Sequence, residues 1–115
     1  MSYVNKLSVI QNDYGYDLEF QLTDSQTPAQ PVDLTDASAI KVFVAESGAS
    51  KAKVVGDCTP TNEENGECKY TVQEGDFDEA PKVYVVEIEV TYAGKVVTAK
   101  GLVLMIGSEL PESTT

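Results

Sequence analysis

The sequence predicts an all-β domain. Short apolar runs recur along its 115 residues, turn-forming Gly, Pro, Asn and Asp residues separate them, and no helical periodicity exceeds one turn. The clearest run covers residues 82–92, where Tyr84, Val86 and Ile88 alternate with outward-facing positions. A chain of this length suits one domain with a single core.

The first and second strands are expected at residues 6–11 and 16–23. The segment DSQTPAQPVD follows and carries two prolines, which indicates a loop or an edge crossing. Residues 33–37 then form a corner in which Asp33 and Asp36 are expected to accept hydrogen bonds from backbone amides. The third strand, residues 38–46, begins after that corner, because Ile40, Val42 and Val44 alternate with their neighbours.

Two further strands are expected at residues 51–57 and 68–73, with TNEENGE as the turn between them. Residues 82–92 and 96–106 complete a hairpin around the tight turn Ala93-Gly94. Seven antiparallel strands in about 105 residues are typical of an immunoglobulin-like β-sandwich. The sequence therefore predicts such a domain over residues 1–107 and a flexible C-terminal tail over residues 108–115.

Same-face positions of the three best-patterned strands are expected to form a shared core. These are Leu18, Phe20, Leu22, Ile40, Val42, Val44, Val86, Ile88 and Val90. Tyr84 follows a loop into the long strand, where sandwich folds place a tyrosine whose hydroxyl ties down that loop.

Charge and composition exclude several functions. The net charge is -11 and all 8 basic residues are lysine, since arginine is absent, so nucleic acid is a poor partner. There is no histidine to act as a base beside a hydroxyl nucleophile or to bind a transition metal. Glu87 and Glu89 resemble the charged outer face of a sheet more than an acid/base pair. We therefore expect a protein that is not an enzyme and needs no cofactor.

No secretory signal and no apolar run long enough for a membrane span are recognisable, so no membrane association is expected. The acidic segment EGDFDEAP, residues 74–81, is a weak calcium candidate, because hard cations bind converging carboxylate oxygens. Its carboxylates are Glu74, Asp76, Asp78 and Glu79. The EF-hand spacing is missing, which favours a solvated acidic loop instead and predicts no metal.

The segment NDYGYD is a candidate partner contact formed by Asp13, Tyr14 and Tyr16. An exposed aromatic pair around a turn glycine suits contact with a protein or a sugar ring. For Tyr14 this reading and simple exposure are equally favoured, whereas Tyr16 is expected to begin a strand and pack inward.

Cys58 and Cys68 flank TPTNEENGE and form either a disulfide or two free thiols. Without histidine, two cysteines are a weak basis for zinc. Residues directly opposed on neighbouring strands can meet the geometry of a bridge. We expect the disulfide in mature protein exposed to air, and free thiols in freshly made protein.

Four segments together resemble one protein family. They are LSVIQNDYGYDLEFQLTD, PVDLTDASAIKVFV, NGECKYTVQEGDF and VYVVEIEVTYAGKVVTAKGLVLMI, and they span residues 5–107. The resemblance is to the N-terminal domain of the baseplate upper protein of tailed bacteriophages and related immunoglobulin-like virion proteins. Its most specific pieces are residues 13–18, residues 32–35, the Asn65-Gly66 turn followed by Tyr70, and Glu87.

This resemblance implies a structural role in a bacteriophage particle. The expected function is a baseplate or tail module that docks, in many copies, against other virion structural proteins after assembly in the host cytoplasm. A capsid decoration or head accessory protein is the alternative within the same class. A carbohydrate-binding or adhesive surface module is the alternative from another class.

Overall fold

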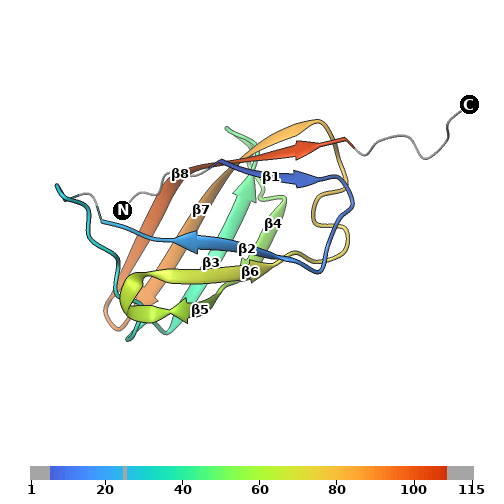
Figure 1. Cartoon of the computed structure of the whole chain (residues 1–115). Helices are drawn as coiled ribbons and strands as arrows, with labels where there is room; N and C mark the ends of the chain where they lie inside the picture. Colours follow the sequence, from blue (N-terminus) through green and yellow to red (C-terminus); the bar gives the residue numbers. More distant parts are fainter. Residues whose placement is uncertain (1–5, 25, 109–115) are drawn as a thin grey trace, which may run out of the picture.

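Eight β-strands and one short 3-10 turn make up the regular structure in the computed structural model, which describes residues 6–24 and 26–108 (Figure 1). The predicted tail, residues 108–115, falls outside the described residues from 109 onward. The elements are β1 (Lys6–Ile10), β2 (Asp17–Gln21), β3 (Ala39–Ala45), β4 (Val54–Asp57), β5 (Thr59–Asn62), η1 (Glu63–Asn65), β6 (Glu67–Thr71), β7 (Lys82–Tyr92) and β8 (Lys95–Gly107).

The strands form two sheets, and the all-β prediction is confirmed. The larger sheet has five strands in the order β1-β8-β7-β3-β4, and the smaller has three in the order β2-β6-β5. Figure 1 shows the smaller sheet lying across the larger one. Apolar side chains of both sheets face the space between them and form one core, because each sheet offers a buried face in a period of two.

The strand pairing corrects one prediction, that all strands are antiparallel. β1 pairs with β8 in parallel, with Lys6 opposite Val103 and Ile10 opposite Gly107, whereas the other strand pairs are antiparallel. Parallel neighbours need a long connection between them. Here the connection is nearly the whole chain, because β1 is the first strand and β8 the last.

The strand count also differs from the predicted seven, because Thr59–Asn62 forms β5 where the sequence suggested a turn. All four residues of β5 are exposed and one of them is Pro60, so apolar alternation is missing. Proline is tolerated here because β5 lies at the edge of its sheet. The turn itself is confined to η1 and Gly66, whose positive φ of 71° suits glycine.

The predicted core is confirmed at all nine positions, since each of those side chains is buried. Leu34, Val72, Phe77, Leu102 and Leu104 join them from the loops and from β8. Gly56 also shapes the core, because a Cβ atom at this position would lie 2.3 Å from a ring carbon of Tyr70. The glycine thus gives the Tyr70 ring the room it needs to pack.

The tyrosine that fixes the corner before β3 is Tyr92, which the sequence did not single out. The Tyr92 hydroxyl donates a hydrogen bond of 2.6 Å to the backbone carbonyl of Asp33. Within the same corner, a carboxylate oxygen of Asp33 accepts hydrogen bonds from the backbone amide of Thr35 (2.9 Å) and from its hydroxyl (2.6 Å), as predicted for Asp33. Tyr84 is buried instead and packs against Phe77.

Candidate functional site: a two-loop tip

Two loops that are far apart in the sequence form one end of the molecule. Residues 11–16 connect β1 to β2, and residues 72–81 connect β6 to β7. They lie beside each other at the right-hand end of Figure 1 and are together called the tip. The tip contains both segments that the sequence singled out, NDYGYD and EGDFDEAP.

Backbone hydrogen bonds join the two loops of the tip. The amides of Asn12 and Gly15 donate to the carbonyls of Phe77 and Val72, both at 2.8 Å, and the Val72 amide donates back to the Tyr16 carbonyl at 2.9 Å. Asn12 and Gly15 adopt positive φ angles of 69° and 85°, which turn these amides toward the second loop. The two loops of the tip therefore form one ordered surface, because backbone hydrogen bonds join them.

Buried side chains hold the tip to the core. Phe77 is buried, and its ring centroid lies 6.2 Å from that of Tyr84 at the start of β7. The Tyr70 hydroxyl on β6 donates a hydrogen bond to the Asp76 carboxylate, which also accepts the Gln73 amide at 2.8 Å. Burial raises the pKa of Tyr70, and the hydrogen bond to Asp76 raises it further, so this hydroxyl stays protonated and continues to donate.

Three of the four acidic calcium candidates bind separate partners. Asp76 binds Tyr70, Asp78 lies 2.5 Å from the Lys53 ammonium, and Glu79 lies 3.4 Å from that of Lys82. Glu74 is exposed. Within residues 6–24 and 26–108, no group of three or more Cys, Asp or Glu side chains is arranged to hold a metal ion. The carboxylates instead act mainly as hydrogen-bond acceptors and ion-pair partners.

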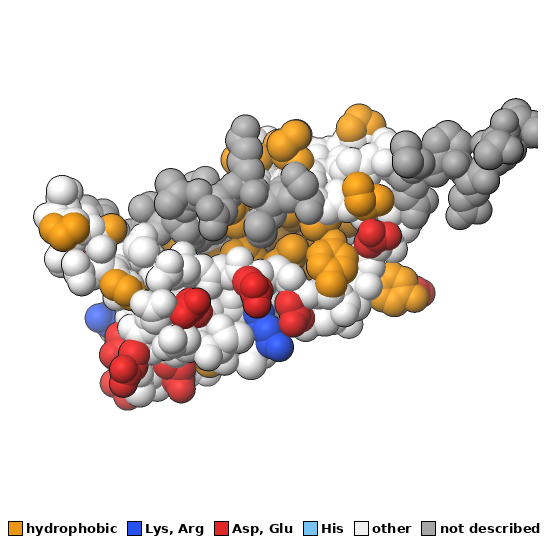
Figure 2. All heavy atoms as spheres, viewed as in Figure 1, with side chains coloured by type: hydrophobic (Ala, Val, Ile, Leu, Met, Phe, Trp, Pro, Cys, Tyr) orange, Lys and Arg blue, Asp and Glu red, His pale blue; other side chains and the backbone are white. Residues whose placement is uncertain are grey.

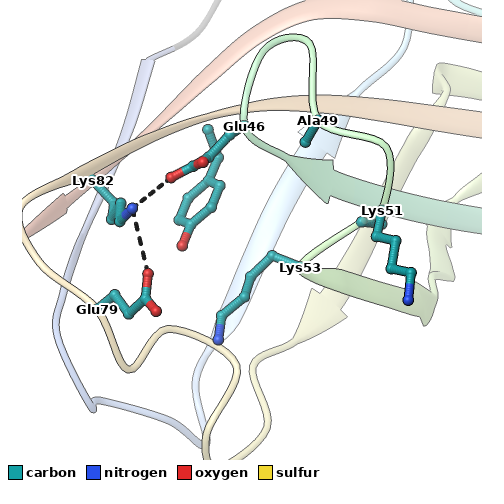
Figure 3. A pocket seen from close by; sticks show the side chains of 8 residues that line it. Glu46, Ala49, Lys51, Lys53, Glu79 and Lys82 are labelled. Carbon is teal, nitrogen blue, oxygen red and sulfur yellow. Dashed lines mark hydrogen bonds and ion pairs between the residues drawn. The ribbon is translucent and has the colours of Figure 1, made fainter.

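Two lysines, Lys53 and Lys82, form ion pairs with acidic residues of the tip, and no sequence pattern predicted these pairs. The Lys82 ammonium lies 2.6 Å from Glu46 and also reaches Glu79, as Figure 3 shows. These residues and Lys53 line a concavity of about 220 Å³. The hydrogen bond between Lys53 and Asp78 is the main cause of two pKa shifts. It raises the pKa of Lys53 and lowers the pKa of Asp78. Lys53 and Asp78 are 25 residues apart in the sequence, so a local sequence pattern cannot predict that they form an ion pair.

Of the predicted contact residues, Asp13 and Tyr14 are exposed and Tyr16 turns inward. The Tyr14 side chain is 55% exposed, so its aromatic ring is available to a partner. Tyr16 packs against the core, as expected, and its hydroxyl is buried with no hydrogen-bond partner among the described residues. Burial is the largest cause that raises the pKa of Tyr16, and the nearby Asp13 and Asp76 add to it.

The surface of the tip is aromatic and acidic together. Figure 2, in the same view as Figure 1, shows hydrophobic side chains beside acidic ones at this end of the molecule. The exposed members are Asp13, Tyr14, Glu74, Asp78 and Glu79. Such a surface is chemically suited to contact a basic partner, because an exposed ring supplies contact area and the carboxylates supply charge.

The two cysteines lie between the sheets as free, buried thiols. Cys58 is the residue at which the chain changes sheets, because its amide donates to Ile40 of β3 at 2.8 Å while Thr59 already pairs with Lys69 of β6. Cys68 lies directly opposite Pro60 and Phe20, so the two cysteines are not the directly opposed pair that the sequence suggested.

The two thiols influence each other, because a side-chain hydrogen bond between them is the main cause of both pKa shifts, upward for Cys58 and downward for Cys68. That hydrogen bond is the main cause that raises the pKa of Cys58, and burial raises it further. Cys58 is therefore held as a thiol at neutral pH. The predicted disulfide remains a prediction for the oxidised protein.

Glu87 and Glu89 extend from the side of β7 that faces away from the core, on alternate positions, as the sequence analysis favoured. Lys41 and Thr98 lie beside Glu89 on the neighbouring strands, and Phe43 lies beside Glu87.

The chain matches no protein-family model and none of the characterised proteins compared with it in sequence. In the described part of the chain, no helix has the length and apolar character required to cross a lipid bilayer.

Proposed function

We propose that this chain is a non-enzymatic structural component of a bacteriophage particle, and that its tip docks against other virion proteins. The observation that carries the proposal is that the candidate contact segment NDYGYD and the acidic segment EGDFDEAP meet in one surface, joined by backbone hydrogen bonds. A surface that is already ordered loses less conformational entropy on binding than two separate loops. The resemblance to baseplate upper proteins supports the same role.

The finer fold belongs to this proposal. We infer that the two sheets are a variant of the immunoglobulin-like sandwich, with β1 moved beside β8 at the edge of the larger sheet. Two facing sheets of five and three strands support it, as does a tyrosine whose hydroxyl ties a corner to the body of the domain. An experimental structure in which the strands close into one continuous barrel would contradict it.

The partner of the tip should present a basic surface with room for an aromatic ring. Asp13, Glu74 and Glu79 provide negative charge around Tyr14, and the whole chain carries a net charge of -11. Electrostatic complementarity of this kind favours a partner rich in lysine or arginine and disfavours nucleic acid. Many copies of one virion protein, arranged with regular spacing, would offer many such sites.

Quantitative mass spectrometry of particles purified from the organism that encodes the chain tests the particle role. We expect the chain in purified particles at a fixed ratio to their major structural proteins. Absence from the particles, with the chain present in the lysate, would overturn the proposal. Its position among the particle proteins, found by chemical cross-linking, separates a baseplate or tail module from a capsid decoration protein.

The tip itself is tested with the double substitution Asp13→Asn and Tyr14→Ala, using Thr61→Ala as the control. Thr61 is exposed on β5 in the smaller sheet, outside the tip. We expect the double variant to enter particles at least about tenfold less than wild type in competition, which corresponds to about 1.4 kcal/mol. Equal incorporation of both variants would show that the tip is not the docking surface.

The exposed ring of Tyr14 also favours a second candidate, a carbohydrate-binding module, because aromatic rings pack against sugar rings. A glycan array separates the two functions. Specific glycan binding that is lost in Tyr14→Ala, with no incorporation into particles, would favour the carbohydrate-binding module.

A further inference from the structure

A second surface lies on the side of the five-stranded sheet that faces away from the core. Its apolar half, called the outer apolar face, comprises Ile10, Phe43, Val55, Val83, Val85 and Met105. Five of these six are 41–57% exposed, and Phe43 is half-buried. They account for five of the seven large hydrophobic residues that are exposed in the described part of the chain.

The pairing of the strands makes this face continuous. Val55 of β4 lies opposite Phe43 of β3, and Val83 of β7 lies opposite Met105 of β8. Between these pairs, Val85 lies opposite both Ala45 and Val103. Ile10 of β1 completes the face, because it lines a concavity of about 540 Å³ together with Val83 and Met105. A contiguous apolar surface across five strands marks an interaction site.

The other half of the same sheet surface carries charges of both signs. Lys41 and Lys100 are there, and so are the carboxylates of Asp57, Glu87 and Glu89. The Lys41 ammonium lies 3.7 Å from Asp57. This surface is therefore nearly balanced in charge, although the chain as a whole carries -11.

We propose that a second copy of this chain packs on the outer apolar face, forming a two-fold symmetric dimer. In a two-fold symmetric interface both copies use the same surface, so this surface must be complementary to itself. An apolar half can cover the partner's apolar half, and the lysines of one charged half can face the carboxylates of the other. The nearly balanced charge is what lets two strongly acidic chains meet at this surface.

The exposed Asp13, Tyr14 and Glu74 of the tip lie in loops beyond the ends of the strands, whereas Pro81, at the end of the second loop, lines the same concavity as Ile10. A dimer would present two tips to its partners. The inference goes beyond the proposed function and does not depend on it, since a dimer can form in purified protein without a particle.

Net charge gives the dimer a distinctive dependence on salt. Two chains of -11 repel each other at a distance, and salt screens that repulsion while leaving the apolar contact intact. The association constant should therefore rise with NaCl concentration. Binding of a basic partner to this face would show the opposite dependence, because its attraction is screened.

Analytical ultracentrifugation of the purified full chain over a concentration series, in low and high NaCl, tests the dimer. We expect a reversible monomer–dimer equilibrium that shifts toward dimer at high NaCl. The substitutions Val85→Lys and Met105→Lys, made separately, should each weaken association at least about tenfold, because each places an unpaired charge in the apolar contact.

The control is Thr61→Lys, because Thr61 is exposed on the edge strand β5 of the smaller sheet, away from the outer surface of the five-stranded sheet. It should dimerise like wild type. Circular dichroism confirms the fold of each variant, and two separate substitutions keep the test valid if one variant does not fold. A wild-type monomer at all concentrations in both salts would overturn the proposal. Equal weakening by Thr61→Lys would also overturn it.

Discussion

Three tyrosine hydroxyls near the core differ in what they bind. The Tyr70 hydroxyl donates to the Asp76 carboxylate, and the Tyr92 hydroxyl donates to the Asp33 carbonyl. The Tyr16 hydroxyl is buried and has no partner among the described residues. A buried polar group without a partner costs free energy, whereas a paired one stabilises the fold, so the same substitution should have opposite effects at these positions.

Tyr16→Phe is expected to raise the free energy of unfolding by about 1 kcal/mol, because it removes a buried hydroxyl that lacks a hydrogen bond. Tyr70→Phe is expected to lower it by about 1.5–3 kcal/mol, because it removes a hydrogen bond to a charged group. Urea denaturation measures both, and each variant is the control for the other. A loss of stability in Tyr16→Phe would show that its hydroxyl has a partner.

The cysteine pair gives a prediction about oxidation. The two thiols interact within the core, and a bridge between them would close a loop that stabilises the protein by about 2–3 kcal/mol. Both thiols are buried and a reducing cytoplasm keeps thiols reduced, so we expect the bridge to form only after exposure to air. Freshly made protein should therefore contain free thiols.

Intact mass after alkylation under denaturing conditions checks this prediction. Aged, unreduced protein should take up no label, whereas the same protein after reduction should take up two. Two labels in the aged, unreduced sample would show that the bridge does not form.

At the scale of the element, β7 and β5 show what a local pattern can predict. β7 alternates buried and exposed residues, and its bounds, Lys82–Tyr92, agree with the predicted strand. β5 has no buried residue, so only its pairing with β6 defines it as a strand. Strands that contribute to the core were predictable for this reason, and an exposed edge strand was not.

The candidate site was predictable in its segments but not in its assembly. NDYGYD and EGDFDEAP are unusual in sequence, and both are in the tip. Their contact depends on β1 and β7 lying on either side of β8, which is a long-range property. The ion pair between Lys53 and Asp78 was not predictable for the same reason, because it joins residues far apart in the sequence.

Ile88→Ala measures how much the central strand β7 contributes to the core. Ile88 is fully buried, so the substitution should lower the free energy of unfolding by about 2–5 kcal/mol through lost burial and a cavity. Glu87→Ala, the exposed neighbour on the opposite face, should change it by no more than about 0.5 kcal/mol. Chemical denaturation measures both, and similar losses in the two variants would contradict the assignment of the faces.

At the scale of the whole molecule, the chain separates binding surfaces from the core. The core between the sheets contains no buried charged residue among those described, and the carboxylates of the described residues lie at the surface or near it. The tip uses part of this charge in ion pairs and exposes the rest. The outer apolar face is nearly neutral. The two surfaces should therefore respond to salt in opposite ways, since docking through the tip weakens with salt and dimerisation strengthens.

The pH dependence of stability tests the ion pair between the tip and its support. The hydrogen bond from Lys53 is the main cause that lowers the pKa of Asp78 in the folded protein. A carboxyl group whose folded pKa is lowered contributes stability at pH values above its unfolded pKa, and that contribution is lost as the pH falls through the folded pKa. Asp78→Asn should therefore destabilise the protein at pH 7. The difference from wild type should shrink as the pH falls below 3.8, the ordinary value for Asp.

Denaturation of wild type and variant across the acid range measures this difference, and comparing the two cancels the general change in net charge to first order. Glu74→Gln is the control, because it removes an exposed carboxylate from the same loop and leaves the Lys53–Asp78 pair in place. It should show no such convergence with wild type. If the Asp78→Asn difference stayed constant down to pH values well below 3.8, the ion pair would not be what Asp78 contributes, because protonation of the wild-type carboxyl would then leave its stabilising effect unchanged.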